Sequence, residues 1–150
     1  MKLYFDECCS RKLAKEIKAF YAADHPDLET CHVLDFYDRA TAESTWLQPL
    51  TEDRAWIAIT NDHGRNPKKE KFHAVCKALG ITYVVLTPGL IKAGYAEHFD
   101  ALVSVWPELL MLHTLPPGSR VSLGFQDTKG ASRTYALRMR QRKLRFQTSN

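Results

Sequence analysis

Carboxylate side chains recur in this chain at the points where apolar segments end. Asp6 and Glu7 directly follow the first apolar run, Asp62 closely follows a later one, and Glu43 stands at the start of a helical pattern. Carboxylates that lie close together repel one another, and the repulsion lowers stability unless a cation offsets it. Hard oxygen ligands of this kind suit Mg²⁺ or Mn²⁺. If the fold brings these acids together, the sequence predicts a divalent metal site.

Divalent ions held by such a group of acids can hydrolyse phosphodiesters. Two divalent ions about 4 Å apart can activate water, align the phosphodiester and stabilise the leaving oxygen. This nuclease chemistry needs no nucleophilic side chain, and the sequence contains no recognisable Ser-His-Asp or Cys-His arrangement. The four cysteines have no zinc-like spacing, so we interpret them as free thiols. They are Cys8, Cys9, Cys31 and Cys76.

Apolar runs and helical patterns alternate between residue 2 and about residue 112. The runs at 2–5, 30–34, 55–59 and 81–86 predict strands, and helical patterns lie between them. This order predicts a three-layer α/β fold, with a mostly parallel central sheet of four or more strands and helices on both faces. Ligands of such sheets bind beyond the carboxyl ends of the strands. The acids expected there are Asp6, Glu7, Asp35, Glu43 and Asp62.

Four residues mark where the predicted helices begin, break or end. Ser10 occupies the N-cap position of the first helix, and Pro49 should kink or shorten the second. Pro67 suits the start of the third helix, which Gly80 should end. A fourth helical pattern covers residues 95–112, with an interruption near Trp106-Pro107.

Length and composition favour one compact globular domain. The chain has 150 residues, of which 45% are hydrophobic, enough for one core. No apolar stretch reaches the roughly 18 residues that a membrane span needs, and an acid at position 6 interrupts the N-terminus too early for a secretory signal. We therefore expect no membrane partner and a cytoplasmic protein.

Charge is unevenly distributed along the chain. Residues 1–119 hold 13 Lys and Arg against 16 Asp and Glu, whereas residues 120–150 hold 8 against 1, which gives net charges of −3 and +7. We predict a domain over residues 1–115 and a basic C-terminal extension over 116–150. A turn at 128–130 predicts a hairpin or arm, and a strand there would carry Arg138, Arg140 and Arg142 on one face.

Three short motifs resemble the PIN-like domains, notably those similar to VapC-type toxins. They are Phe5-Asp6-Glu7, Glu43-Ser44-Thr45-Trp46-Leu47 and the strand from Trp56 to Asp62. The resemblance extends over approximately residues 2–112. It implies that Asp6, Glu43 and Asp62 bind Mg²⁺ or Mn²⁺ and cleave RNA. It also implies RNA, an antitoxin protein and a second copy of the chain as candidate partners.

Further residues are candidates for the same site. No acid after Asp62 clearly matches the fourth acid of the family, so Glu7 and Asp38 are additional candidate ligands, and Asp38 competes with Glu43 for the helix position. A solvated loop or an exposed helix face would explain the basic residues near Asp62 equally well. The candidate nucleic-acid-binding residues are Arg65, Lys68, Lys69, Arg138, Arg140 and Arg142.

Three functions remain open at this point. The first is a metal-dependent endoribonuclease, the toxin of a toxin–antitoxin pair. The second is a non-catalytic PIN-like module that binds RNA or protein through its basic arm. The third is a receiver-like phosphoacceptor domain, because acids follow the first and third strands and Thr87 follows the fourth, although no lysine after a fifth strand is evident.

Overall fold

A single seven-stranded sheet forms the centre of the computed structural model, which describes residues 1–53, 55–65, 71–127, 134–140 and 142–146. The strand order is β2-β1-β3-β4-β5-β6-β7, parallel from β2 to β5 and antiparallel from β5 to β7. This confirms the predicted α/β fold class. The strands are β1 (Lys2–Phe5), β2 (Glu29–His32), β3 (Trp56–Thr60), β4 (Tyr83–Leu86), β5 (Arg120–Asp127), β6 (Thr134–Met139) and β7 (Arg142–Lys143).

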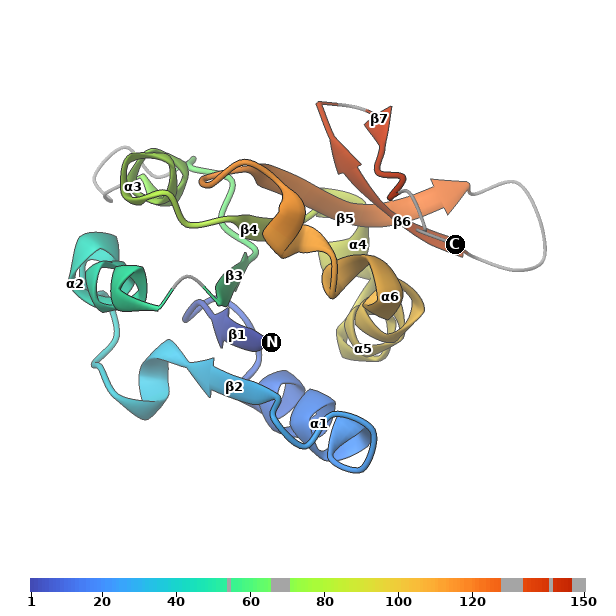
Figure 1. Ribbon diagram of the computed structural model, residues 1–150, viewed down its shortest axis with the longest axis horizontal. Helices are drawn as coiled ribbons and strands as arrows, with labels where there is room; N and C mark the ends of the chain where they lie inside the picture. The colour runs from blue at the N-terminus through green and yellow to red at the C-terminus, as the bar shows by residue number, and fades with distance from the viewer. Residues whose placement is uncertain (54, 66–70, 128–133, 141, 147–150) are drawn as a thin grey trace.

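Helices cover both faces of the sheet (Figure 1). In Figure 1, α1, α5 and α6 lie on one side, and α2 and α3 lie on the other. None of the helices in the described part of the chain has the length and hydropathy of a membrane-spanning helix. The helices are α1 (Arg11–Tyr21), α2 (Glu43–Leu47), α3 (Phe72–Leu79), α4 (Pro88–Ala93), α5 (Tyr95–Ser104) and α6 (Trp106–Leu109), with 3₁₀ turns at Val33–Asp35, Gln48–Glu52 and Leu112–Thr114.

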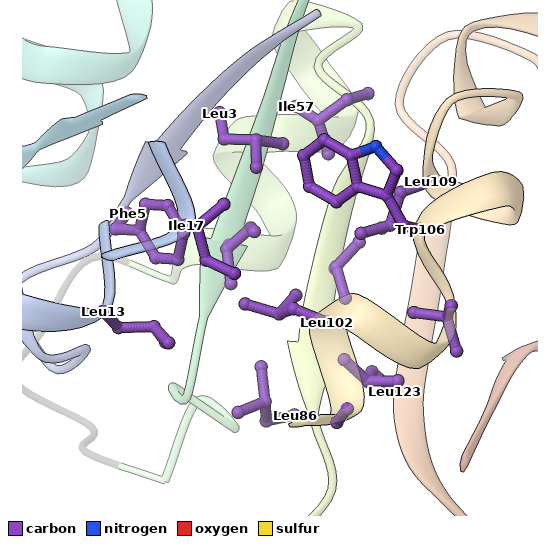
Figure 2. Packing of buried hydrophobic residues seen from close by; sticks show 14 of the residues in the cluster. Leu3, Phe5, Leu13, Ile17, Ile57, Leu86, Leu102, Trp106, Leu109 and Leu123 are labelled. Atoms are coloured by element: carbon purple, nitrogen blue, oxygen red, sulfur yellow. The ribbon is translucent and has the colours of Figure 1, made fainter. Parts of the chain in front are cut away.

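Alternation along the strands divides the buried side chains between two clusters. In β1, Leu3 and Phe5 face the large cluster beneath α1, α5 and α6, whereas Tyr4 faces a smaller cluster beneath α2 and α3. Figure 2 shows the large cluster, in which Leu102 from α5 lies among side chains from the central strands. Because β1 and β3 are buried on both faces, they read as continuous apolar runs in the sequence.

Local hydrogen bonds explain where several elements begin or end. The second strand ends at His32 rather than near residue 34, because the His32 ring accepts from Leu34 N at 3.1 Å and the Asp35 carboxylate accepts from His32 N at 3.1 Å. These bonds close a 3₁₀ turn. Ser10 occupies the N-cap position of α1 as predicted, but its side chain makes no capping bond.

Proline and glycine act at the helix ends largely as predicted. The α-helix α2 is short and passes into a 3₁₀ turn that contains Pro49. Gly80 ends α3 with a φ of 72°, a left-handed conformation that favours glycine. Pro67, which was expected to begin this helix, lies outside the described residues, and the described helix begins at Phe72.

The C-terminal region continues the central sheet. β5 pairs in parallel with β4, and β6 returns antiparallel to β5, which gives the two arms of the predicted hairpin, whereas its predicted turn at 128–130 lies outside the described residues. The sheet therefore runs across the predicted boundary between residues 115 and 116, and the division of the chain there stays a prediction.

The three arginines of the arm do not share a face, so that prediction was wrong. The chain turns at Arg140, whose φ is 52°, and this turn separates β6 from β7. Arg138 lies opposite Lys143, whereas Arg142 lies opposite Met139. Because residues directly opposite one another share a face of the sheet, Arg138 and Arg142 lie on opposite faces.

Candidate metal centre

Asp6 lies immediately beyond the carboxyl end of β1 and is only 1% exposed. Its backbone N–H donates to the carbonyl of Ile59 at 2.9 Å, which holds the residue against β3. Its carboxylate accepts from the backbone N–H of Glu7 at 2.7 Å and from the hydroxyl of Thr60 at 2.8 Å. These bonds offset part of the cost of burying the charge and fix the direction in which the carboxylate points.

Thr60 connects the first acid to the third. Its hydroxyl donates to Asp6 and accepts from the backbone N–H of Asp62 at 2.9 Å. The Asp62 carboxylate accepts from the backbone N–H of Gly64 at 2.7 Å, and Gly64 has a φ of 71°. A tight turn thus directs Asp62 back toward the end of β1, and glycine suits the left-handed backbone of that turn.

Glu43 enters the site from the opposite direction, as the first residue of α2. Although it is a carboxylate, it is only 1% exposed. Its Oε2 atom accepts from the indole N–H of Trp46 at 2.9 Å. Trp46 is itself stacked on Tyr4, with ring centroids 5.2 Å apart. The aromatic cluster beneath α2 and α3 therefore fixes the rotamer of a buried acid.

The three acids converge on one point. One carboxylate oxygen from each of Asp6, Glu43 and Asp62 lies within 4.8 Å of the other two. Three hard oxygen donors from three separate elements fit the ligand preference of Mg²⁺ or Mn²⁺. Two of these acids are almost completely buried, and a buried charge favours a nearby opposite charge. The site could therefore hold a divalent ion.

Cys8 is a free thiol, as predicted, and it lies beside this group of acids. Its thiol donates to Asp6 Oδ2 at 3.4 Å and lies 3.6 Å from Thr60 Oγ1. It also accepts from the backbone N–H of Asn61 at 3.2 Å. The chain turns directly after β1, where Cys9 N donates to the carbonyl of Asp6 at 2.9 Å. Only the position of Cys8, two residues after the first acid, could have indicated this contact.

Two other acids lie near the site but outside the group of three. Among the described residues, the group contains neither Glu7 nor Asp38. Glu7 accepts from the backbone N–H of Ala40 at 3.0 Å, and the carbonyl of Asp38 accepts from the Thr41 hydroxyl at 2.7 Å. Their roles as metal ligands stay predictions.

Asp35 has a different role from the one that its place after a strand suggested. Its carboxylate accepts two hydrogen bonds from the guanidinium of Arg11, at 2.6 and 3.1 Å. It also accepts from the backbone N–H of His32. Among the described residues Asp35 does not belong to the group of three acids that could hold a metal ion, because the 3₁₀ turn directs it toward α1.

Two histidines border the loop that carries Asp62. The ring of His63 hydrogen-bonds to the carbonyl at the end of β4 at 2.7 Å, and the ring of His73 hydrogen-bonds to the hydroxyl of Tyr83 at 2.8 Å. Burial lowers the pKa of His73, the positive charge of Arg120 lowers it further, and the negative charge of Asp62 acts in the opposite direction. The charges of Arg120 and Asp62 therefore both act on the pKa of His73.

The predicted nucleic-acid-binding residues occupy different places. Arg65 is exposed in the loop after Asp62, while Lys68 and Lys69 lie outside the described residues. Arg138 is half-buried on β6, and Arg140 and Arg142 are exposed. Their roles in binding stay predictions.

Comparison with known proteins gives the family. Residues 1–87 match the model of the PIN like domain. Because the match covers more than half of the chain, this protein belongs to the PIN-like domain family, as its motifs indicated. No curated protein and no solved structure gives a significant match. The family and the three acids together indicate a nuclease-type function with a site that could bind metal.

Proposed function

We propose that this protein is a metal-dependent endoribonuclease that hydrolyses RNA phosphodiesters. The observation that carries the proposal is the approach of one oxygen each from Asp6, Glu43 and Asp62 to within 4.8 Å of one another. The family supports a nuclease rather than another use of the same acids. RNA is the substrate class that the resemblance to VapC-type toxins implies.

Each residue of the site has a distinct task in this proposal. Asp6, Glu43 and Asp62 would hold Mg²⁺ or Mn²⁺, which when bound supplies Lewis acidity toward the phosphate oxygens. Thr60 orients Asp6 with its hydroxyl proton and holds the backbone of Asp62 with its lone pair. Trp46 holds Glu43 through its indole N–H. Such supporting bonds fix ligand geometry before the ion arrives.

Substitution of Asp62 tests the proposal most directly. Asp62→Asn preserves size and the bond to Gly64 but removes a charged ligand from a half-exposed position. We expect Mn²⁺-dependent cleavage of a fluorescent single-stranded RNA to fall by about 1,000-fold or more, since metal stabilisation of the transition state amounts to several kcal/mol. Asp6→Asn should give a similar loss. Asp27→Asn, at an exposed turn, is the matched control and should retain activity.

Calorimetric titration with Mn²⁺ separates this function from its alternative. If the wild-type chain binds RNA but takes up no Mn²⁺ and cleaves nothing, the protein is a non-catalytic PIN-like module. If both Asp6→Asn and Asp62→Asn cleave at the wild-type rate while remaining folded, the three acids are not the catalytic centre. Thermal melts of both variants establish that they are folded.

The phosphoacceptor alternative finds no support at Thr87. Its hydroxyl accepts from Leu90 N at 3.4 Å at the start of α4 and packs against Gly124. Absence of a mass increase after incubation with a small phosphodonor would dismiss this alternative.

We also propose an antitoxin protein and a second copy of the chain as partners. Both proposals rest on the resemblance to VapC-type toxins. Light scattering on the purified protein should give the mass of a homodimer, and a monomer at micromolar concentration would contradict it. Addition of the antitoxin should suppress RNA cleavage, and unchanged cleavage by a stable complex would contradict an inhibitory role.

A further inference from the structure

One row of side chains crosses the sheet from the metal centre to its far edge. Strand register aligns Thr60 with Val85, then Ser122, Arg138 and Lys143. Residues aligned in this way point to the same face, here the face of α2 and α3. At about 4.8 Å between neighbouring strands, Arg138 lies roughly 14 Å and Lys143 roughly 19 Å from Thr60.

The far part of this face is polar and accessible. Arg120, Gln126 and Lys143 are exposed, and Ser122 and Arg138 are half-exposed. We call these five residues the open face. The helices that pack most extensively on β5 and β6 are α4 and α5, and their buried side chains belong to the large cluster on the opposite side. In Figure 1, α5 and α6 likewise lie on that opposite side.

Two cations of the open face are held together by a neutral residue. Arg138 donates to the backbone carbonyl of Gln126 at 3.2 Å, and Lys143 donates to the side-chain oxygen of Gln126 at 3.1 Å. Within the described ranges, the recorded ion pairs involve neither of these cations. Two like charges held side by side, without a carboxylate among these contacts, form a site for an anion.

Arg120 extends this positive charge toward the metal centre. It opens β5 on the same face, and its charge acts on His73, which also senses Asp62. Thr87 lies so close to Gly124 that a Cβ atom there would approach it to 2.6 Å. Only glycine fits beneath Thr87 at this position of β5. Strand register therefore places the positive residues on the same face of the sheet as Thr60, which holds Asp6 and Asp62.

We propose that the open face binds the sugar-phosphate backbone of single-stranded RNA, so that one part of the bound RNA lies at the metal centre and another lies at Arg138 and Lys143, beyond the buried residues Thr60 and Val85 of this row. The placement of the RNA at the metal centre rests on the proposed function, whereas RNA binding by the open face does not. Phosphates complement adjacent cations that lack a recorded acidic partner, and a strand bound there would have one end at the three acids. The family match ends at residue 87, so this surface belongs to the part of the chain beyond it.

Charge reversal at Lys143 tests the open face with little risk to folding, because the residue is exposed. The full-length chain is titrated with a fluorescent 20-nucleotide RNA by anisotropy, in EDTA so that nothing is cleaved, at several salt concentrations. We expect Lys143→Glu to weaken binding about tenfold at low salt and to reduce the slope of log K against log salt by about 0.7. Arg138→Gln should also weaken binding, as a second variant. Lys15→Glu, on exposed α1, is the control for net charge and should bind as the wild type does.

Arg142→Glu distinguishes this face from the arm as a whole. Arg142 is the neighbour of Lys143 in β7 and is equally exposed, but it points to the other face. If Arg142→Glu lowers RNA affinity clearly less than Lys143→Glu does, the proposal is supported, whereas equal losses of RNA affinity overturn it. Unchanged RNA binding with weakened binding of an acidic protein partner also overturns it.

Failure of the two proposals can be told apart. If RNA binding depends on Lys143 but the protein never cleaves RNA, the open face is an RNA-binding site and the proposed nuclease activity is wrong. If the protein cleaves RNA with Mn²⁺ and kcat/KM is equal in Lys143→Glu and Lys15→Glu, the nuclease activity is supported and RNA binding by the open face is wrong.

Discussion

The two sides of the sheet differ in where they bury charge. On the side of α1, α5 and α6, the core is a large apolar cluster completed by a stack of Tyr21 on Trp106, with ring centroids 3.7 Å apart. On the side of α2 and α3, a smaller cluster adjoins the buried carboxylates Asp6 and Glu43. One side therefore stabilises the fold mainly by removing apolar surface from water, while the other also holds polar groups in fixed positions.

This separation explains how a domain of this size can keep acids buried. Burial of a carboxylate is costly unless hydrogen bonds and nearby charges compensate for it. The large cluster supplies stability without depending on the arrangement of the acids. Substitutions on the two sides should accordingly have different consequences, for stability on one side and for metal binding on the other.

The largest effect on stability is expected in the large cluster. Leu102 is fully buried in α5 (Figure 2), and Leu102→Ala should lower the free energy of unfolding by about 2–5 kcal/mol. Mn²⁺ affinity of the folded protein should stay unchanged. Urea denaturation and calorimetry measure the two quantities. Asp100→Ala, exposed on the same helix, should change stability by no more than about 0.5 kcal/mol. A loss of Mn²⁺ affinity in folded Leu102→Ala would show that the sides are coupled.

A smaller effect on stability, but a clear one on metal, is expected from Thr60→Val. The substitution preserves shape and removes the hydroxyl that bonds to both Asp6 and Asp62. Mn²⁺ affinity should fall about 10- to 100-fold, and stability should fall by about 1–2 kcal/mol. The matched control is Thr82→Val, a buried threonine just before the amino end of β4, whereas Thr60 lies at the carboxyl end of β3. Equal Mn²⁺ affinities in the two variants would remove Thr60 from the site.

The smallest effect concerns the pH dependence of stability. Burial lowers the pKa of His73 in the folded protein below its usual value. The unfolded chain therefore binds the proton first, and the free energy of unfolding decreases as pH falls below about 6.5. His73→Gln should abolish this part of the decrease. Between pH 7.5 and 5.5 in EDTA, the drop in Tm of the variant should be smaller than that of the wild type by up to about 3 °C. Identical pH profiles for wild type and variant would contradict the expected role.

Much of the fold follows from patterns that are local in sequence. The apolar runs located β1, β3 and β4 because strands buried on both faces need apolar residues throughout. Because the carboxyl ends of parallel strands lie together, the predicted strands also placed Asp6 and Asp62 at the same end of the sheet. Glu43 was located as the acid at the start of a helical pattern, and the motif supplied its role as a ligand, because nothing local specifies where a short helix packs.

The failures occurred where side chains or turns override these patterns. The alternation of arginines predicted one continuous strand, but the positive φ of Arg140 turns the chain between Arg138 and Arg142. Asp35 follows a strand as a ligand should, yet Arg11 from another element binds it. The bond from Trp46 to Glu43 was missed although the i, i+3 spacing on a helix permits it. Contacts between distant segments were the information that the sequence alone lacked.

The pairing of β5 with β4 has a practical consequence for dissecting this protein. A fragment cut after residue 87, where the family match ends, would expose the whole hydrogen-bonding edge of an apolar parallel strand. Such edges recruit other chains and promote aggregation, whereas the intact sheet ends in β7, a strand of only two residues, both positively charged. Expression of the isolated segment should therefore yield insoluble material, because the C-terminal hairpin no longer covers the edge of β4.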